Sequence, residues 1–500
     1  MIIARILILL PLVSANKPQF PLGIAVYANP EFDICHRDMR AVMETRDLKF
    51  FNSVIDKTRI YSWPLKNFKS DIESLHNSPL FQLVRKMPKG AALHIHHKAM
   101  VNTDWLYLQT YRTNLYVCDK HNHLSLKFFK TPSNDCNWQA LYERRRNPLV
   151  RQVLEDRIRR QMTMLTEIPD RSDTNVLWEK FQNIFTFLRS FLNYRPLAED
   201  HFYQGLLELY EDNVMYVEVR SGLQKLYDLD GKIYTTTETV NILHDVVTRF
   251  KADHPDFIGA KIIYAKSRDM DHDELRSFLH ETVELKKMFP GFIAGADLVG
   301  HEDAGYKLKD HSSLLLEVSN WTDFFFHAGE TQNFLLQPTN LQIAIRHNAK
   351  RIGHAYSITK EPDTLRELKE KNIPVEVCPI SNQVLGLVSN LRNHQAAILF
   401  ALDIPVVISN DDPGLWGAKG LSDDFYMTLM SILPMNANLY SLKKIARNSI
   451  IYSTLSENEK AAALDSYEKR WQQFLINVTM PFCDYTQVMY SWLTLDRNTW

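Results

Sequence analysis

The sequence predicts an α/β fold, a (β/α)8 barrel with additions, and three observations support this prediction. Eight short runs of β-branched and other apolar residues recur along the chain, as expected for buried parallel strands. Each run ends on polar or charged residues, which is where barrel enzymes carry their chemistry. From the second run to the eighth, the runs are separated by about twenty to forty residues, enough for one crossover helix each.

The polar ends of the eight runs mark the predicted strands in chain order. Because parallel strands present their C-terminal ends at one face of a barrel, these ends are expected to meet there. They read Leu-His94-Ile-His96, Val-Glu-Val-Arg220, Tyr-Ala-Lys-Ser-Arg268, Asp297-Leu-Val-Gly300, Phe-His327-Ala-Gly-Glu330, Ile-Gly-His354, Cys-Pro-Ile-Ser381-Asn382 and Ile-Ser-Asn410-Asp411-Asp412.

The segments outside the barrel predict a secreted chain with helical additions. Residues 1–15, with one arginine, an apolar run and a Val-Ser-Ala end, predict a signal peptide cut after Ala15. Residues 16–88 hold helical patterns at Arg37–Asn52 and Lys69–Lys86, and would cap the barrel or pair with a second subunit. The barrel is assigned to residues 89–105 and 151–482, and residues 483–500 form a tail.

The first gap between strands is much longer than the others. Helical patterns at 176–193 and 199–212 fill its second half. Residues 106–150 instead mix aromatic and basic residues with turn clusters, which predicts an inserted subdomain beside the C-terminal face of the barrel. Cys118 and Cys136 flank part of this stretch and could close it in an oxidising compartment. Cys378 is expected to be a core thiol, and spacing leaves open whether Cys35 and Cys483 pair or stay free.

Composition limits the classes of function. With 58 basic and 59 acidic residues, the chain has no long-range field that favours nucleic acid or an acidic membrane surface. No segment is long and apolar enough to predict a membrane span. Two N-x-S/T sequons, at Asn320 and Asn477, fit an extracellular glycoprotein, and Asn320 is expected to be the more hindered because a core strand follows it.

Three of the strand ends together predict a metal site. His94 and His96 alternate on one strand, so both imidazoles point into the barrel. His327 adds a third nitrogen, and Asp411 adds a carboxylate oxygen. Three nitrogens and one oxygen suit a hydrolytic Zn²⁺ centre with an open position for water. A single His-x-His is more often packing or surface, and it is the combination of the strand ends that favours the metal.

The remaining polar ends supply groups for an attack by water. A zinc ion lowers the pKa of bound water toward neutrality and so provides a hydroxide nucleophile. Glu330 follows the strand that carries His327 and is predicted to be the general acid. His354 is predicted to hold the hydroxide, and Asp412 to contact substrate. Taken singly, Glu330 could be a helix N-terminal carboxylate and Asp412 an N-cap.

These motifs resemble the adenosine deaminase family, most closely its secreted growth-factor subfamily, from about Met87 to Trp471. The resemblance implies hydrolysis of adenosine or 2′-deoxyadenosine to the inosine product and ammonia. It implies an N-terminal segment used for homodimerisation and an inserted subdomain that binds a receptor or a polyanionic glycan. The motifs are Met-Pro-Lys-Gly, Leu-His94-Ile-His96, Tyr-Glu-Asp-Asn-Val-Met-Tyr, His-Pro-Asp-Phe-Ile-Gly, Asp297-Leu-Val-Gly300-His-Glu-Asp, His327-Ala-Gly-Glu330-Thr, Arg-Ile-Gly-His354, Glu-Val-Cys-Pro-Ile-Ser-Asn and Ser-Asn-Asp411-Asp412-Pro.

The resemblance also implies a role for each site residue. Glu330 would protonate purine N1 while hydroxide attacks C6, and His354 would orient that hydroxide. Asp412 would hydrogen-bond N7, and the backbone amide of Gly300 would bind N3. The remaining implied roles are zinc binding by His94, His96, His327 and Asp411 and a disulfide between Cys118 and Cys136.

Two positions depart from the family's pattern. The secreted subfamily has an acidic residue directly after the second histidine, and the intracellular enzymes have one a position later. This chain has His97 and Lys98 there. Since the acidic group is thought to hold a ribose hydroxyl, we expect weaker nucleoside binding through a neutral His97, unless Lys98 faces away. Relatives often carry tryptophan where this chain has Ala198, and its loss would raise KM before it changed the chemical step.

Three alternatives stand beside a secreted zinc adenosine deaminase. One is an extracellular signalling ligand with weakened catalysis, against which the unaltered Glu330, His354 and Asp412 argue. Another is a deaminase of a 5′-phosphorylated adenine nucleotide, because the basic pair His97 and Lys98 would suit a phosphate. The third is a zinc amidohydrolase of unrelated substrate, which the purine-like set of polar groups disfavours.

Overall fold

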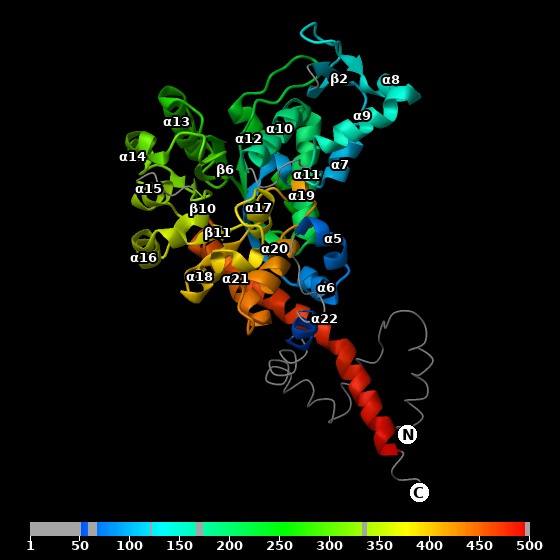
Figure 1. Cartoon of the computed structure of the whole chain (residues 1–500), viewed down its shortest axis with the longest axis vertical. Helices are drawn as coiled ribbons and strands as arrows, with labels where there is room; N and C mark the ends of the chain where they lie inside the picture. Colours follow the sequence, from blue (N-terminus) through cyan, green and yellow to red (C-terminus); the bar gives the residue numbers. More distant parts are fainter. Residues whose placement is uncertain (1–51, 59–67, 121–122, 167–173, 333–337, 496–500) are drawn as a thin grey trace. The chain divides into compact units, whose positions relative to one another are not determined.

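The computed structural model describes residues 52–58, 68–120, 123–166, 174–332 and 338–495 (Figure 1). The predicted signal peptide, Cys35 and all of the helical pattern at Arg37–Asn52 except its last residue lie outside these ranges. The chain divides into a larger unit, Thr58–Phe474, and a smaller one that joins Met1–Lys57 to Leu475–Trp500. In the smaller unit the described residues are helical: residues 52–57 and the part of α22 (Glu457–Leu495) from Leu475 onward.

The larger unit contains the predicted barrel strands, all parallel to their neighbours. One sheet has the order β1-β5-β6-β7-β8 and the other has the order β12-β11-β10-β9. In both sheets, strands that follow one another along the chain are neighbours. The strands are β1 (Gly90–His96), β5 (Val214–Ser221), β6 (Gly259–Ser267), β7 (Ile293–Val299), β8 (Asp323–Phe324), β9 (His327–Ala328), β10 (Ile352–His354), β11 (Val375–Val377) and β12 (Val406–Ile408).

Two junctions join these sheets into the barrel. The fifth predicted strand is present as two short strands, β8 in the first sheet and β9 in the second, which are separated by two residues. One of these two residues, Phe326, accepts a hydrogen bond at 2.8 Å from the backbone amide of Gly353 on β10. At the other junction Ile95 of β1 forms a parallel bridge with Asp411. There the His96 amide donates to the Asp411 carbonyl at 2.9 Å. The predicted (β/α)8 barrel is confirmed.

Helices between the strands cover the outside of the barrel. In Figure 1, α13, α14, α15 and α16 lie outside β6, β10 and β11. Capping boxes begin α12 at Thr235 and α13 at Asp271, because each cap side chain and the glutamate three residues later exchange hydrogen bonds with the backbone. These helices are α12 (Thr236–Asp253), α13 (His272–Met288), α14 (Ser312–Val318), α15 (Asn340–Arg346), α16 (Pro362–Glu370), α17 (Pro379–Val384), α18 (Ala396–Ala401), α19 (Pro413–Trp416), α20 (Ser422–Met427) and α21 (Leu439–Ile451).

The long first gap contains an antiparallel sheet and several helices. The sheet has the order β3-β2-β4, and the predicted disulfide is present between Cys118 on β2 and Cys136. The two predicted helices of the gap are confirmed as α10 and α11. The elements are α7 (Thr103–Gln109), β2 (Leu115–Lys120), β3 (His123–Phe128), β4 (Gln139–Ala140), α8 (Leu141–Arg146), α9 (Pro148–Arg160), α10 (Thr174–Leu192) and α11 (Arg195–Glu211).

Two local expectations can be compared with the structure. The helical pattern at Lys69–Lys86 is confirmed as two helices, α5 (Phe68–His76) and α6 (Pro79–Lys86). The break occurs because the Ser78 hydroxyl accepts from the Phe81 amide as an N-cap and Pro79 occupies the first turn. Asn320 is exposed after α14, so the expected hindrance of that sequon is not seen.

Among the described residues, no helix meets the length and apolarity needed to cross a bilayer.

Candidate active site

A cavity of about 530 Å³ opens at the C-terminal ends of the barrel strands. Its lining includes residues of β1, β5, β6, β7 and β9, the turn after β12, and the helices α10 and α11. Of the predicted site residues, the structure brings these to its wall: His96, His97, Gly300, His327, Glu330, Asp411 and Asp412.

The four predicted metal ligands meet at one end of this cavity. The Nε2 atom of His327 lies 3.0 Å from Nε2 of His94 and 3.3 Å from Nε2 of His96. The Oδ1 atom of Asp411 lies 3.3 Å from Nε2 of His94 and 3.0 Å from Nε2 of His96. All four groups therefore turn a ligand atom toward one point.

Two buried carboxylates determine which ring nitrogens face that point. The Nδ1 atom of His94 lies 2.8 Å from Glu376, and the Nδ1 atom of His327 lies 2.7 Å from Asp297. In each pair the Nδ1–H group of the ring donates a hydrogen bond to the carboxylate, so Nε2 carries no proton and keeps its lone pair. The Nε2 atoms of His94 and His327 lie 3.0 Å apart, with the carboxylate of Asp411 beside them. The lone pairs of these atoms repel one another unless a cation lies between them.

The four groups fit a zinc ion. Ligand atoms that each lie about 2.0–2.2 Å from one zinc ion are separated from their neighbours by about 3 Å, and the separations above agree with this. The Asp411 Oδ1 atom is buried and accepts no hydrogen bond among the described residues. A second cluster would replace two of the histidines with His354 and Cys378. Burial raises the pKa of Cys378 well above its usual range, so that residue stays a thiol, as predicted, and is a poor ligand.

Two buried arginines neutralise the carboxylates behind the ligands. Arg220 donates to Asp297 at 2.7 Å and to Glu376 at 2.6 Å. Arg351 donates to Glu376 at 2.5 Å and to Glu218 at 2.6 Å. All five side chains are almost fully buried. Sequence reasoning assigned Glu376 no role, although its place in the motif Glu-Val-Cys-Pro marked it.

Glu330 lies beside this cluster on the turn after β9. The carboxylate of Glu302 holds that turn, because it accepts the backbone amides of Gly329 at 3.0 Å and Glu330 at 2.7 Å. Gly329 has φ = +77°, a conformation that favours glycine. Burial raises the pKa of Glu330 well above its usual range, and the charges of Asp411 and Glu302 raise it further. Burial and these two neighbouring charges therefore favour the protonated form of the Glu330 carboxyl.

His354 lies at the end of β10, with Nε2 3.6 Å from the Glu330 carboxyl and 4.0 Å from Asp411. Its φ of +63° is unusual for a residue with a side chain and aims the ring into the site. Nε2 of His354 is buried and has no hydrogen-bond partner among the described residues, so it is free to meet a bound molecule.

A chain of hydrogen bonds sets the tautomer of His354. The backbone amide of Ala396 donates to Nδ1 of His394 at 3.0 Å, so the proton of that ring is on Nε2. His394 Nε2 donates to the Asn382 oxygen at 3.0 Å. The Asn382 amide nitrogen then donates to His354 Nδ1 at 3.1 Å, which places the His354 proton on Nε2. Sequence reasoning had no signal for His394, which lies outside the strand ends.

The two remaining residues that were predicted to contact the substrate, Asp412 and Gly300, also line the cavity. Asp412 is buried, and its Oδ1 atom has no hydrogen-bond partner among the described residues. Burial and the adjacent Asp411 raise the pKa of Asp412 well above its usual range. Gly300 has φ = +105°, a conformation open mainly to glycine, and it lines the cavity where β7 ends.

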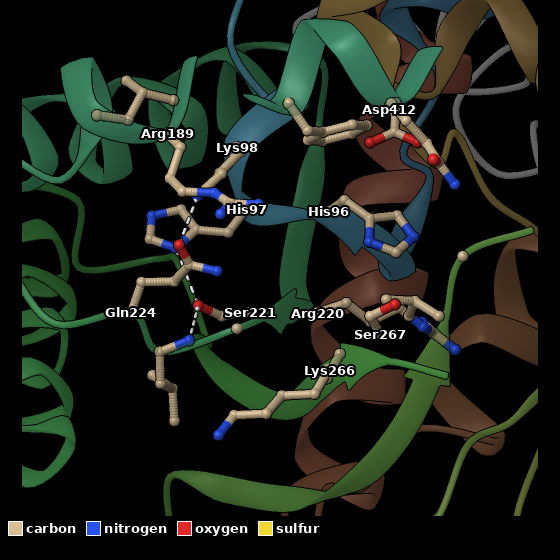
Figure 2. A pocket seen from close by; sticks show the side chains of 18 of the residues that line it. His96, His97, Lys98, Arg189, Arg220, Ser221, Gln224, Lys266, Ser267 and Asp412 are labelled. Atoms are coloured by element: carbon tan, nitrogen blue, oxygen red, sulfur yellow. Dashed lines mark hydrogen bonds between the residues drawn. The ribbon is translucent and has the colours of Figure 1, made fainter. Parts of the chain in front are cut away.

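The predicted basic pair needs correction. Burial lowers the pKa of His97 to about 3, so this ring is neutral, and its Nδ1 atom lies 3.0 Å from the Ser221 hydroxyl. Lys98 lines the cavity rather than facing away, and donates to the Gln224 oxygen at 2.9 Å. A second cation comes from Arg189 on α10, as Figure 2 shows. Burial and the Arg189 charge lower the pKa of Lys98 to about 7.

Ala198, on α11, is buried in the wall of the cavity. It belongs to a small apolar cluster with Leu226, Tyr234 and Ile242.

Comparison with known proteins agrees with this fold and site. Residues 158–470 match the adenosine deaminase family. The chain is 40% identical over 419 residues to adenosine deaminase 2 of Sus scrofa, covering 81% of this chain and 82% of that protein. It is 39% identical over 430 residues to adenosine deaminase 2 of Homo sapiens, covering 83% and 84%.

Solved structures share the architecture at low identity. The Arabidopsis N6-mAMP deaminase aligns with a TM-score of 0.58 and 16% identity, over 78% of this chain and 99% of that chain. An amidohydrolase from Burkholderia ambifaria with bound Zn aligns with a TM-score of 0.55 and 16% identity, over 80% and 95%. The fold and site thus define a (β/α)8 barrel with a candidate metal site at the C-terminal ends of its strands. The chain belongs to the adenosine deaminase family.

Proposed function

We propose that the protein is a secreted, zinc-dependent adenosine deaminase that hydrolyses adenosine and 2′-deoxyadenosine to the inosine product and ammonia. The observation that carries the proposal is the meeting of four candidate ligand atoms with the buried carboxyl of Glu330 at one end of a single cavity. Identities of about 40% to several adenosine deaminases support the substrate.

His94, His96, His327 and Asp411 would hold the zinc ion. When bound, zinc supplies a water nucleophile that ionises near neutral pH. The protein's part is to keep the Nε2 lone pairs directed inward through Glu376 and Asp297, and to keep those carboxylates ionised through Arg220.

Glu330 would donate its proton to N1 of the purine. Protonation at N1 draws electron density from C6, which makes that carbon open to attack and later lets the amine leave as ammonia. This role needs a carboxyl that keeps its proton near neutral pH, and the raised pKa of Glu330, caused by burial and by the charges of Asp411 and Glu302, supports it.

His354 would orient the attacking water through its Nε2 proton, which the Asn382 amide keeps in place. The Oδ1 atom of Asp412 and the backbone amide of Gly300 would bind N7 and N3, and so set the purine plane. Each of these groups lies on a different strand end, so the barrel rather than a flexible loop determines their separation.

The test is a spectrophotometric adenosine assay on the full chain loaded with zinc. Glu330→Gln should keep fold and zinc content but lose at least 10²-fold in kcat, the low end of the usual range for a lost general acid. Glu370→Gln, an exposed glutamate on α16, is the matched control and should keep full activity. Absence of turnover by wild-type protein with zinc bound would overturn the proposal and favour the signalling ligand.

Secretion, homodimerisation through residues 16–88 and binding of a receptor or glycan by the inserted subdomain belong to the same proposal. The disulfide between Cys118 and Cys136 supports an oxidising compartment. Mass spectrometry of protein from culture medium would test cleavage after Ala15 and glycans on Asn320 and Asn477. Light scattering on the same sample would give the oligomeric state.

A further inference from the structure

We propose that the end of the cavity away from the metal cluster is an anion subsite, built by Lys98 and Arg189, that takes the 5′-phosphate of an adenine nucleotide. The inference rests on the proposed deaminase function and extends its substrates from nucleosides to nucleoside 5′-monophosphates.

The two cations share the cavity with the proposed reaction centre. Both side chains belong to its lining, together with Glu330 and Asp412. In Figure 2, Lys98 and Arg189 lie together and apart from His96 and Asp412. Lys98 follows His96 by two residues, so their Cα atoms are no more than about 7 Å apart. One elongated ligand can therefore contact both ends.

Neither cation is neutralised within the described part of the chain. Lys98 donates to the neutral amide of Gln224, and Arg189 forms no ion pair there. Lys266, a third basic residue of the lining, lies 3.6 Å from Glu281 and is thus balanced. The ammonium and guanidinium groups therefore line one wall with no carboxylate bonded to either of them, and a bound dianion could accept hydrogen bonds from both.

The acidic groups of the lining are distributed in the opposite way. Asp411, Asp412 and Glu330 lie at the metal end. Asp269, the other acidic residue of the lining, accepts from the Ser267 hydroxyl at 2.8 Å. Lys98 and Arg189 therefore lie away from the carboxyl groups of the metal end. This arrangement matches a nucleotide whose neutral base lies at the metal end and whose anionic phosphate lies at the two basic side chains.

The chemistry of the two side chains favours phosphate over a ribose hydroxyl. The guanidinium of Arg189 is permanently charged and presents paired N–H donors that match two phosphate oxygens. The ammonium group of Lys98, which lies on the short helix η1 (His97–Ala99) directly after β1, adds further N–H donors. His97 is not counted in the subsite, since its Nδ1 atom already lies 3.0 Å from the Ser221 hydroxyl.

The experiment measures kcat/KM of the full zinc-loaded chain for adenosine and for adenosine 5′-monophosphate. We expect turnover of both, and a ratio of nucleotide to nucleoside kcat/KM that falls at least tenfold in Arg189→Gln. Arg189→Lys should recover part of the ratio because it restores the charge. Lys225→Gln, an exposed basic residue outside the cavity lining, is the matched control and should leave the ratio unchanged.

Turnover of adenosine without turnover of the monophosphate would overturn the subsite while leaving the proposed function intact. An unchanged ratio in Arg189→Gln would overturn it as well. If neither substrate is turned over, calorimetric titration with inosine and inosine 5′-monophosphate decides the matter. Binding of the monophosphate no tighter than inosine, or equally tight in Arg189→Gln, would then count against the subsite independently of catalysis.

Discussion

The side-chain amide nitrogen of Asn382 lies 3.1 Å from Nδ1 of His354, and this contact determines which nitrogen of His354 carries the proton. Both side chains are almost fully buried, so water does not compete for the bond. The Asn382 oxygen is held by His394, whose own tautomer follows from a backbone amide donor. Residues that do not touch the cavity centre therefore place the proton of His354 on Nε2, the nitrogen that faces the metal cluster.

Asn382→Asp should lower kcat more than KM. The carboxylate cannot donate to Nδ1 of His354, so the proton moves to Nδ1 and Nε2 loses its donor role. We expect a loss of roughly 10–100-fold in kcat, typical of outer partners of a site. Asn436→Asp, an exposed site with the same charge change, is the control. An unchanged kcat with normal folding would show that the tautomer of His354 does not matter.

Removal of metal should abolish activity and lower the melting temperature. Without a cation, the Nε2 atoms of His94 and His327 face each other at 3.0 Å beside the unpartnered Asp411 oxygen. A ligand at about 100 times its Kd adds about 2.7 kcal/mol to the stability of the folded state. Calorimetry after chelation and after zinc is restored checks this. Equal melting temperatures in the two states would argue against a resident metal at these four residues.

Arg220→Met should destabilise the fold by about 3–5 kcal/mol, the usual cost of leaving buried charges without their partner. The substitution removes donors from Asp297 and Glu376, and these in turn hold His327 and His94. Urea unfolding gives the stability, and zinc titration should show weaker binding. Lys369→Met on the exposed side of α16 is the control. If Arg220→Met is as stable as the wild type, the charge of Arg351 alone is enough to balance the buried carboxylates.

Stability should fall as pH drops from about 6.5 toward 4, partly through His394. Burial lowers its pKa to about 4, whereas in the unfolded chain it titrates near 6.5. Between these values the unfolded state binds the additional proton, so the free energy of unfolding decreases as pH falls, by about 1.4 kcal/mol per pH unit. Urea unfolding at several pH values measures the slope. His394→Gln should reduce it, and an identical slope in the variant would contradict this contribution.

The sequence by itself determined the fold class and the candidate ligands, because both depend on local periodicity. Alternation places His94 and His96 on one side of a strand whatever surrounds it, and apolar runs that end on polar residues predict parallel strands with their ends at one face. The break between α5 and α6 was also readable, since Ser78 and Pro79 form a local start signal.

Only the tertiary structure decided the charge states and the partners of these residues. Arg189 reaches Lys98 from a helix about ninety residues away in sequence, and His394 acts on His354 through Asn382. Burial and pairing set the protonation of a group, and both depend on which distant elements the fold brings beside it. For that reason the sequence showed only the pair His97 and Lys98 at this position, whereas the fold also places the guanidinium of Arg189 beside Lys98.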